Sequence, residues 1–204
     1  RSSPTTTAPV KKQALAAAAP AALAARAAGD PLQCTPGVVY GLSNQGLLQE
    51  VSATGVVTPI GQAAAIDPGP PAIPGVSATA FNGLGIGLGG REIYAYARTA
   101  ATAGINTIAN LYKFDVTANK WTNIGVRYET NNDGMTGGLI AGAVDLKTGQ
   151  FFFGGYAPDG KTFWLWKYTP GGAVKFLGKV DTSAGSVGGQ TTNVNIAFDS
   201  SGNL

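Results

Sequence analysis

A hairpin-like pattern recurs three times along this chain of 204 residues and constrains its fold more than any other feature. Each copy has a strand-like run, a polar turn and a second strand-like run that ends in glycine. The copies are GLLQEVSATGVVTPIG (46–61), NLYKFDVTANKWTNIG (110–125) and LWKYTPGGAVKFLG (165–178). The first two align without a gap, and the third has one residue fewer in its turn. Gly61, Gly125 and Gly178 are therefore equivalent positions of one repeated unit.

A further pair of strand-like segments precedes the second and third copies, at 85–98 and 141–156. NIAFDSSGNL (195–204) starts what should be another such pair, with Asp199 aligned on Asp145. The turns KTGQ and SSGN place glycine where a hairpin needs positive φ. After residue 30 no segment shows a sustained apolar period of 3.6 residues, which an amphipathic helix would require. The repeated unit is therefore four strands in just over fifty residues.

Four-stranded antiparallel units at this period predict an all-β protein, and specifically a β-propeller. We expect a partial propeller of about three four-stranded blades plus the start of a fourth. In the first unit we expect only the outer hairpin, and we expect further blades after Leu204. An open ring leaves sheet edges unpaired, so we also expect Cys34 to pair with a cysteine beyond residue 204. A β-sandwich whose hairpins happen to be similar is the alternative.

The composition excludes several chemistries. The chain has no histidine, which removes the commonest general base, the usual catalytic triads and every His-ligated metal site. Its single cysteine, Cys34, excludes an internal disulfide and a CxxC motif. Residues 31–204 contain ten Lys or Arg and ten Asp or Glu, so they have no net charge to attract phosphate. We therefore expect no nucleic-acid binding, no cofactor, no metal and no catalytic residue.

The first thirty residues differ from the rest of the chain, being rich in Ala, Pro and Thr. Two lysines (11–12), an Ala-rich apolar run (14–25) and an Ala-x-Ala site (25–27) follow one another in the order of a secretory leader. An Ala/Pro linker without a targeting role is the alternative. We expect residues 1–30 to lie outside the domain formed by 31–204, and the protein to be secreted or at the cell surface. The Ala-rich run is too short and too weakly apolar for a transmembrane helix.

Local sequences resemble known propeller families. FDVTANKWTNIG is similar to a Kelch hairpin, and FDSSGNL is similar to the blades of NHL-type propellers. Over 34–204, CTPGVVYGLSNQGLLQEVSATGVVTPIG, FNGLGIGLGGREIYAYAR and NLYKFD resemble an uncharacterised propeller-like N-terminal domain of secreted, mainly actinobacterial surface proteins. That family has no assigned catalytic residues. The resemblance implies export and a role at the cell surface, and it implies nothing about chemistry.

Carboxylates and amides give two candidate polar sites. Asp145 and Asp199 are a pair of the kind that a glycosidase uses, but their equivalent places in the repeat indicate turn-flanking structural roles. The loop TNNDGMTGG (130–138) contains two asparagines and an aspartate whose oxygens suit calcium, but no distal glutamate follows, as an EF-hand loop requires. A solvated connection between blades is the preferred interpretation of this loop.

Four aromatic residues are the remaining candidates for ligand contact. Tyr94, Tyr96, Trp164 and Trp166 have rings that can stack on a sugar. Packing inside the blades is the alternative, and we prefer it because aromatic residues in strands are mostly buried.

Three functions from different classes follow from these observations. The first is a non-catalytic secreted or cell-surface propeller that serves as a scaffold or in adhesion. The second is a propeller that binds an extracellular carbohydrate or peptide through its central face. The third is a fragment of a propeller hydrolase or lyase, which the absence of histidine and the low charge disfavour. The partner in the first two would be an extracellular glycan or protein.

Overall fold

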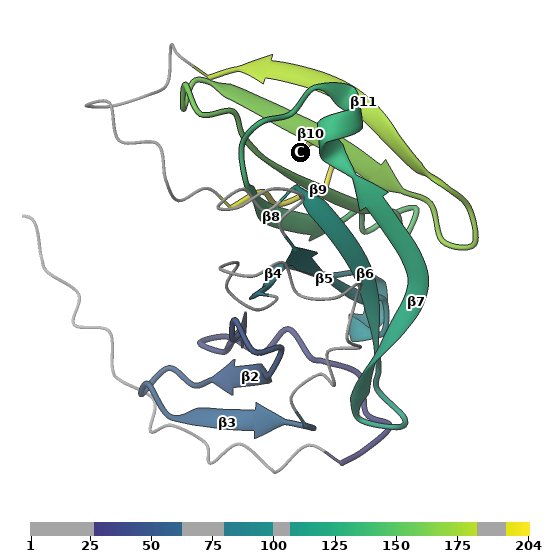
Figure 1. Ribbon diagram of the computed structural model, residues 1–204. Helices are drawn as coiled ribbons and strands as arrows, with labels where there is room; N and C mark the ends of the chain where they lie inside the picture. The colour runs from purple at the N-terminus through teal and green to yellow at the C-terminus, as the bar shows by residue number, and fades with distance from the viewer. Residues whose placement is uncertain (1–26, 63–79, 100–106, 183–194) are drawn as a thin grey trace, which may run out of the picture.

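The computed structural model describes residues 27–62, 80–99, 107–182 and 195–204, which form eleven strands and two short 3-10 turns (Figure 1). Sheet 1 contains β1 (Val39–Leu42), β2 (Leu48–Val51) and β3 (Val57–Ile60). Sheet 2 contains β4 (Ala80–Ile86), β5 (Ile93–Thr99), β6 (Ile108–Asp115) and β7 (Lys120–Glu129). Sheet 3 contains β8 (Leu139–Val144), β9 (Phe151–Tyr156), β10 (Thr162–Tyr168) and β11 (Val174–Asp181). The all-β prediction is confirmed.

Each sheet is an antiparallel meander, in which every strand pairs with the next one along the chain. The three repeated hairpins are β2–β3, β6–β7 and β10–β11. Gly125 lies in β7 and Gly178 in β11, each at a bulge in the last strand of its sheet, and Gly61 directly follows β3. All three have positive φ, at 70°, 73° and 139° in chain order. The equivalence of these glycines in the sequence is therefore an equivalence in the structure.

Two details differ from the sequence prediction. Sheet 1 has three strands and not only the outer hairpin, because Val39–Leu42 pairs with Leu48–Val51. β1 has only four residues and one of them is glycine, so its strand signal is weak. The segment 195–204 forms the expected turn, in which the Asp199 amide donates to the Asn203 carbonyl oxygen at 2.9 Å, but it contains no strand.

Two hydrophobic cores join the three sheets. The core between sheets 2 and 3 contains mostly aromatic side chains: Tyr94, Tyr96, Phe151, Phe153, Trp164, Trp166 and Tyr168. The core between sheets 1 and 2 contains Leu48, Ile60, Phe81, Ile93, Tyr112, Phe114 and Trp121. Leu32 also joins the second core, and its amide donates to the Gly90 carbonyl oxygen at 3.0 Å. The sheets therefore follow one another in a stack with sheet 2 in the middle.

The first strands of sheets 2 and 3 approach each other more closely than side chains would allow. A Cβ atom added to Gly142 of β8 would overlap the carbonyl group of Gly83 in β4, and one added to Gly85 would lie 2.8 Å from the Ala143 carbonyl carbon. Glycine at these positions permits backbone-to-backbone contact. In Figure 1 the stack is curved, with β4 and β8 on its concave side and β7 and β11 on its convex side.

Three stacked sheets are one more than the two of a β-sandwich. The described strands do not close into a ring. Neither of the 3-10 turns in the described segments has the length or the hydrophobicity that a membrane crossing requires.

Candidate functional site

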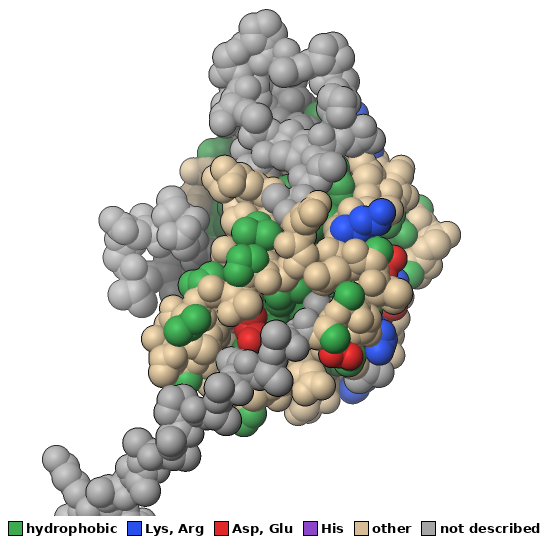
Figure 2. Space-filling view, turned by 90° about the horizontal axis from the view of Figure 1, so that it is seen from below, with side chains coloured by type: hydrophobic (Ala, Val, Ile, Leu, Met, Phe, Trp, Pro, Cys, Tyr) green, Lys and Arg blue, Asp and Glu red, His purple; other side chains and the backbone are tan. Residues whose placement is uncertain are grey.

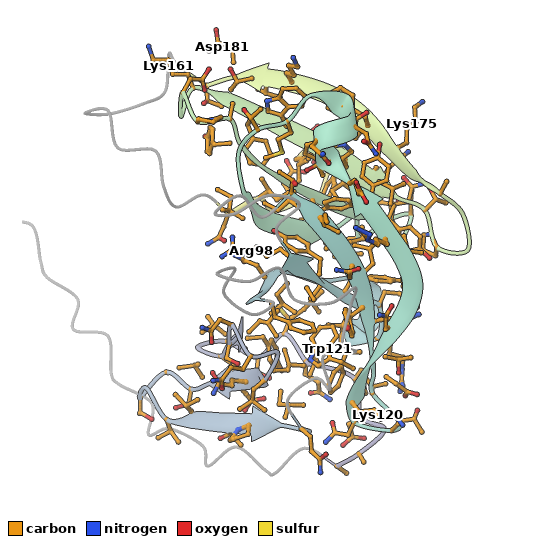
Figure 3. The ribbon with its side chains drawn as sticks, in the orientation of Figure 1. Arg98, Lys120, Trp121, Lys161, Lys175 and Asp181 are labelled. Carbon is orange, nitrogen blue, oxygen red and sulfur yellow. The ribbon has the colours of Figure 1, made fainter. Side chains whose placement is uncertain are left out.

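The concave side of the stack is the candidate site, because first strands of successive sheets converge there. Arg98 lies near the end of β5, and Figure 3 places it on this side. Its guanidinium Nη1 donates to the carbonyl oxygen of Leu139, the first residue of β8. Its Nε atom is buried and has no hydrogen-bond partner among the described residues. An unsatisfied buried donor costs free energy, and Nε is closed to solvent, so only the rest of the half-buried Arg98 side chain faces the concave side.

Sequence reasoning did not select Arg98. The available signal was its position at the end of EIYAYAR, where a charged residue follows an otherwise apolar and aromatic strand. The contact with Leu139 joins residues 41 positions apart, and it forms only because β8 packs beside β4. A single sequence contains no direct information on such a contact.

The four aromatic residues that the sequence offered for ligand contact all lie in the core between sheets 2 and 3. None is more than 5% exposed. Trp164 and Trp166 stack with ring centroids 6.1 Å apart, and the Tyr96 hydroxyl donates to the Ala141 carbonyl oxygen at 3.3 Å. Burial raises the pKa of Tyr96 far above its ordinary value. The rings are thus packed against protein side chains, as the alternative interpretation expected, and sugar stacking at Tyr94, Tyr96, Trp164 and Trp166 has no support in this arrangement.

The loop considered for calcium is held in place by its own aspartate. Asp133 accepts hydrogen bonds from the Trp166 indole N–H at 2.7 Å and from the Tyr128 hydroxyl at 2.8 Å. Burial, and next the hydrogen bond to Asp133, raise the pKa of Tyr128 to about 12. Asn131 and Asn132 are exposed. The Asp133 carboxylate therefore ties the connection between β7 and β8 to the side chains of Trp166 and Tyr128. Within the described segments no three His, Cys, Asp or Glu side chains gather as a metal site.

Four hairpin aspartates use their carboxylates inside their own turns. Each accepts hydrogen bonds from backbone amides two to four residues further along: Asp115, Asp145, Asp159 and Asp199. The pKa of Asp145 is lowered mainly by the side-chain hydrogen bond from Thr148, and that of Asp199 mainly by the side-chain hydrogen bond from Asn203. Backbone amide hydrogen bonds are the main cause that lowers the pKa of Asp115 and Asp159. The turn role predicted for Asp145 and Asp199 is confirmed.

A separate ion pair lies beside the aromatic core. The Lys113 ammonium lies 2.9 Å from Glu92 Oε2, and the Tyr94 hydroxyl donates to the same carboxylate at 3.1 Å. Burial, and next the charge of Glu92, raise the pKa of Tyr94 well above its ordinary value. Lys113 and Glu92 are paired with each other, and this cluster ties β6 to the residue that directly precedes β5.

Comparison of the chain with known protein families, characterised proteins and solved structures finds no match. The resemblance to a propeller-like domain of secreted surface proteins stays a prediction from the sequence.

Proposed function

We propose that the chain is a non-catalytic β-propeller module of a secreted or cell-surface protein, with a role as a scaffold or in adhesion. The observation that carries this proposal is the repeated unit itself, a four-stranded meander stacked on the next through a glycine-rich first strand. A propeller is built from four-stranded sheets repeated around a central channel, and stacked antiparallel meanders support this architecture. The prominent carboxylates serve turns, one loop and one ion pair, which supports a structural role over an enzymatic one.

Export is the part of the proposal that rests on the first thirty residues. The test is a fusion of residues 1–30 to a secreted-reporter enzyme that lacks its own leader. We expect reporter activity in the medium and cleavage after Ala27, read by N-terminal sequencing. The matched control lacks residues 14–25, the apolar run. Retention of the intact fusion in the cell would contradict export and favour the linker interpretation.

Ligand binding on the concave side is the second candidate, and the half-buried Arg98 on that side favours it. A guanidinium recognises carboxylate and other anionic oxygens. The test measures binding of neutral and acidic glycans to the parent chain, to Arg98→Gln and to the control Arg127→Gln. Arg127 is a suitable control because its guanidinium is paired with the Glu129 carboxylate at 2.8 Å. Saturable binding of acidic glycans that is lost only in Arg98→Gln would establish a binding module. For a scaffold, we expect that the chain binds none of these glycans and hydrolyses no ester, glycoside or peptide substrate.

A further inference from the structure

Sheet 1 has an exposed apolar row on the face turned away from sheet 2. Val39, Val51 and Val57 lie directly opposite one another on β1, β2 and β3. Val39 is 62% exposed and Val57 is 51% exposed. Figure 2 views the molecule from the end of the stack that sheet 1 forms, and it shows hydrophobic and uncharged side chains with few charges. Valines in register on an exposed sheet face are unusual on a soluble surface.

The same positions pack into a core in sheet 3. There the row across the second, third and fourth strands is Phe151, Tyr168 and Val174. Val174 lies four residues before Gly178, as Val57 lies four residues before the equivalent Gly61. The sheet 3 row packs against the sheet that precedes it, with the Phe151 ring centroid 5.6 Å from that of Tyr94 in sheet 2. By this equivalence, the valine row is the face on which sheet 1 receives a preceding sheet.

Sheet 1 also lacks the first strand that the other sheets have. β5 pairs with β4 and β9 pairs with β8, whereas β1 pairs only with β2 among the described strands. On the side of β4 that faces sheet 3, Gly83 and Gly85 are buried because β8 lies against them. On the side that faces sheet 1, Leu84 and Ile86 stay half-buried, since the described part of sheet 1 has no corresponding first strand to cover them. An open strand edge beside an apolar surface is a template for one more strand.

A segment with the character of a first strand is present at the other end of the stack. Asn195–Phe198 precedes the Asp199 turn as Ala141–Val144 precedes the Asp145 turn, and it belongs to no sheet in the described structure. The Phe198 ring packs on Phe152 with centroids 4.9 Å apart. Since Phe151 and Phe153 face sheet 2, Phe152 lies on the far face of sheet 3. Val180, opposite Phe163 on β11, is 51% exposed.

We propose that a second copy of this chain binds head to tail, with its sheet 1 seated on the far face of sheet 3 and its β1 paired with Asn195–Phe198. This rests on the proposed propeller architecture. Within one chain the two surfaces cannot meet, because sheet 2 lies between sheets 1 and 3. A head-to-tail contact closes into a ring when its rotation permits.

The first test measures the mass of the 204-residue chain by sedimentation velocity and light scattering at increasing concentration. We expect a dimer of the 20.6 kDa chain. Val39→Lys places an ammonium in the contact, and it should raise the dissociation constant more than about tenfold. Val56→Lys is the matched control, because Val56 is 61% exposed but lies in the β2–β3 turn. A monomer at every concentration, or an equal effect of the two variants, would overturn the proposal.

The second test locates the strand pairing. Residue 196 is the counterpart of Gly142, which lies opposite Phe153, the counterpart of Gly41. In a Cys34→Ser background, chains with Gly41→Cys and chains with Ile196→Cys should form a mixed disulfide, because directly opposed residues have neighbouring Cβ atoms. Val56→Cys with Ile196→Cys should not. A dimer without the 41–196 disulfide would reject the head-to-tail pairing and leave the proposals on export and ligand binding unchanged, since neither depends on it.

Discussion

Replacement of Gly142 by alanine should lower the melting temperature, because β4 and β8 touch through their backbones. The new Cβ would lie 2.7 Å from the Gly83 Cα and closer still to the Gly83 carbonyl group. Backbone atoms cannot turn aside as the end of a long side chain can. Overpacking of this kind costs about 1–3 kcal/mol, while the stiffer unfolded chain returns about 0.4–1 kcal/mol. The net loss of about 1–2 kcal/mol corresponds to a melting temperature lower by about 2–8 °C for a domain of this size.

Gly41→Ala is the matched control for this prediction. Gly41 also lies in a strand and has an ordinary φ, but no atom lies within 4 Å of the position that its Cβ would occupy. We expect this variant to be as stable as the parent chain or slightly more stable. Unfolding is followed by tryptophan fluorescence, since Trp164 and Trp166 lie in the core between sheets 2 and 3. Equal melting temperatures for Gly142→Ala and Gly41→Ala would refute the close approach of β4 and β8.

Three further predictions concern the polar contacts. Asp133→Ala should lower the free energy of unfolding by about 1–3 kcal/mol in urea titrations, because the Trp166 indole N–H loses its acceptor. The turn aspartates have lowered pKa values in the folded chain, so the stability that they contribute is present above about pH 4 and is lost as the pH falls through the lowered pKa values. When the urea midpoint of unfolding is plotted against pH, Asp145→Asn should therefore show a smaller decrease at acid pH than the parent chain. The pKa of Tyr128 is raised to about 12, so the stability that Tyr128 contributes to the folded chain is complete below about pH 10 and is lost as the pH rises through 12. Tyr128→Phe should therefore show a smaller decrease of the urea midpoint at alkaline pH.

The sequence predicted the features that depend on neighbours in the chain. The hairpins were found because their signals are local: an aspartate or glycine at each turn, and Gly125 or Gly178 at each bulge. Asn119 has positive φ, at 55°, in the turn where the other copies have glycine. That substitution is common because asparagine tolerates this conformation, and it did not obscure the alignment.

The features that the sequence did not predict depend on contacts between sheets. The indole of Trp166 and the carboxylate of Asp133 are 33 residues apart, and Arg98 reaches Leu139 across 41 residues. Whether Tyr96 faces a ligand or a core could not be decided, since an aromatic residue in a strand suits both. β1 was missed for a different reason, because a four-residue strand with a glycine has too little β-propensity to be recognised alone.

The distribution of residue sizes across each sheet explains why the stack curves. At the first strands, Gly83 and Gly142 allow two backbones to touch. At the last strands, larger side chains such as Ile124, Tyr128 and Phe176 pack into the core between sheets 2 and 3. Adjacent sheets therefore lie closer at one edge than at the other, and each added sheet turns the stack in the same direction. This curvature brings the first strands of successive sheets toward a common axis. Arg98 lies on this concave side, and its contact with the Leu139 carbonyl oxygen joins sheet 2 to the first strand of sheet 3.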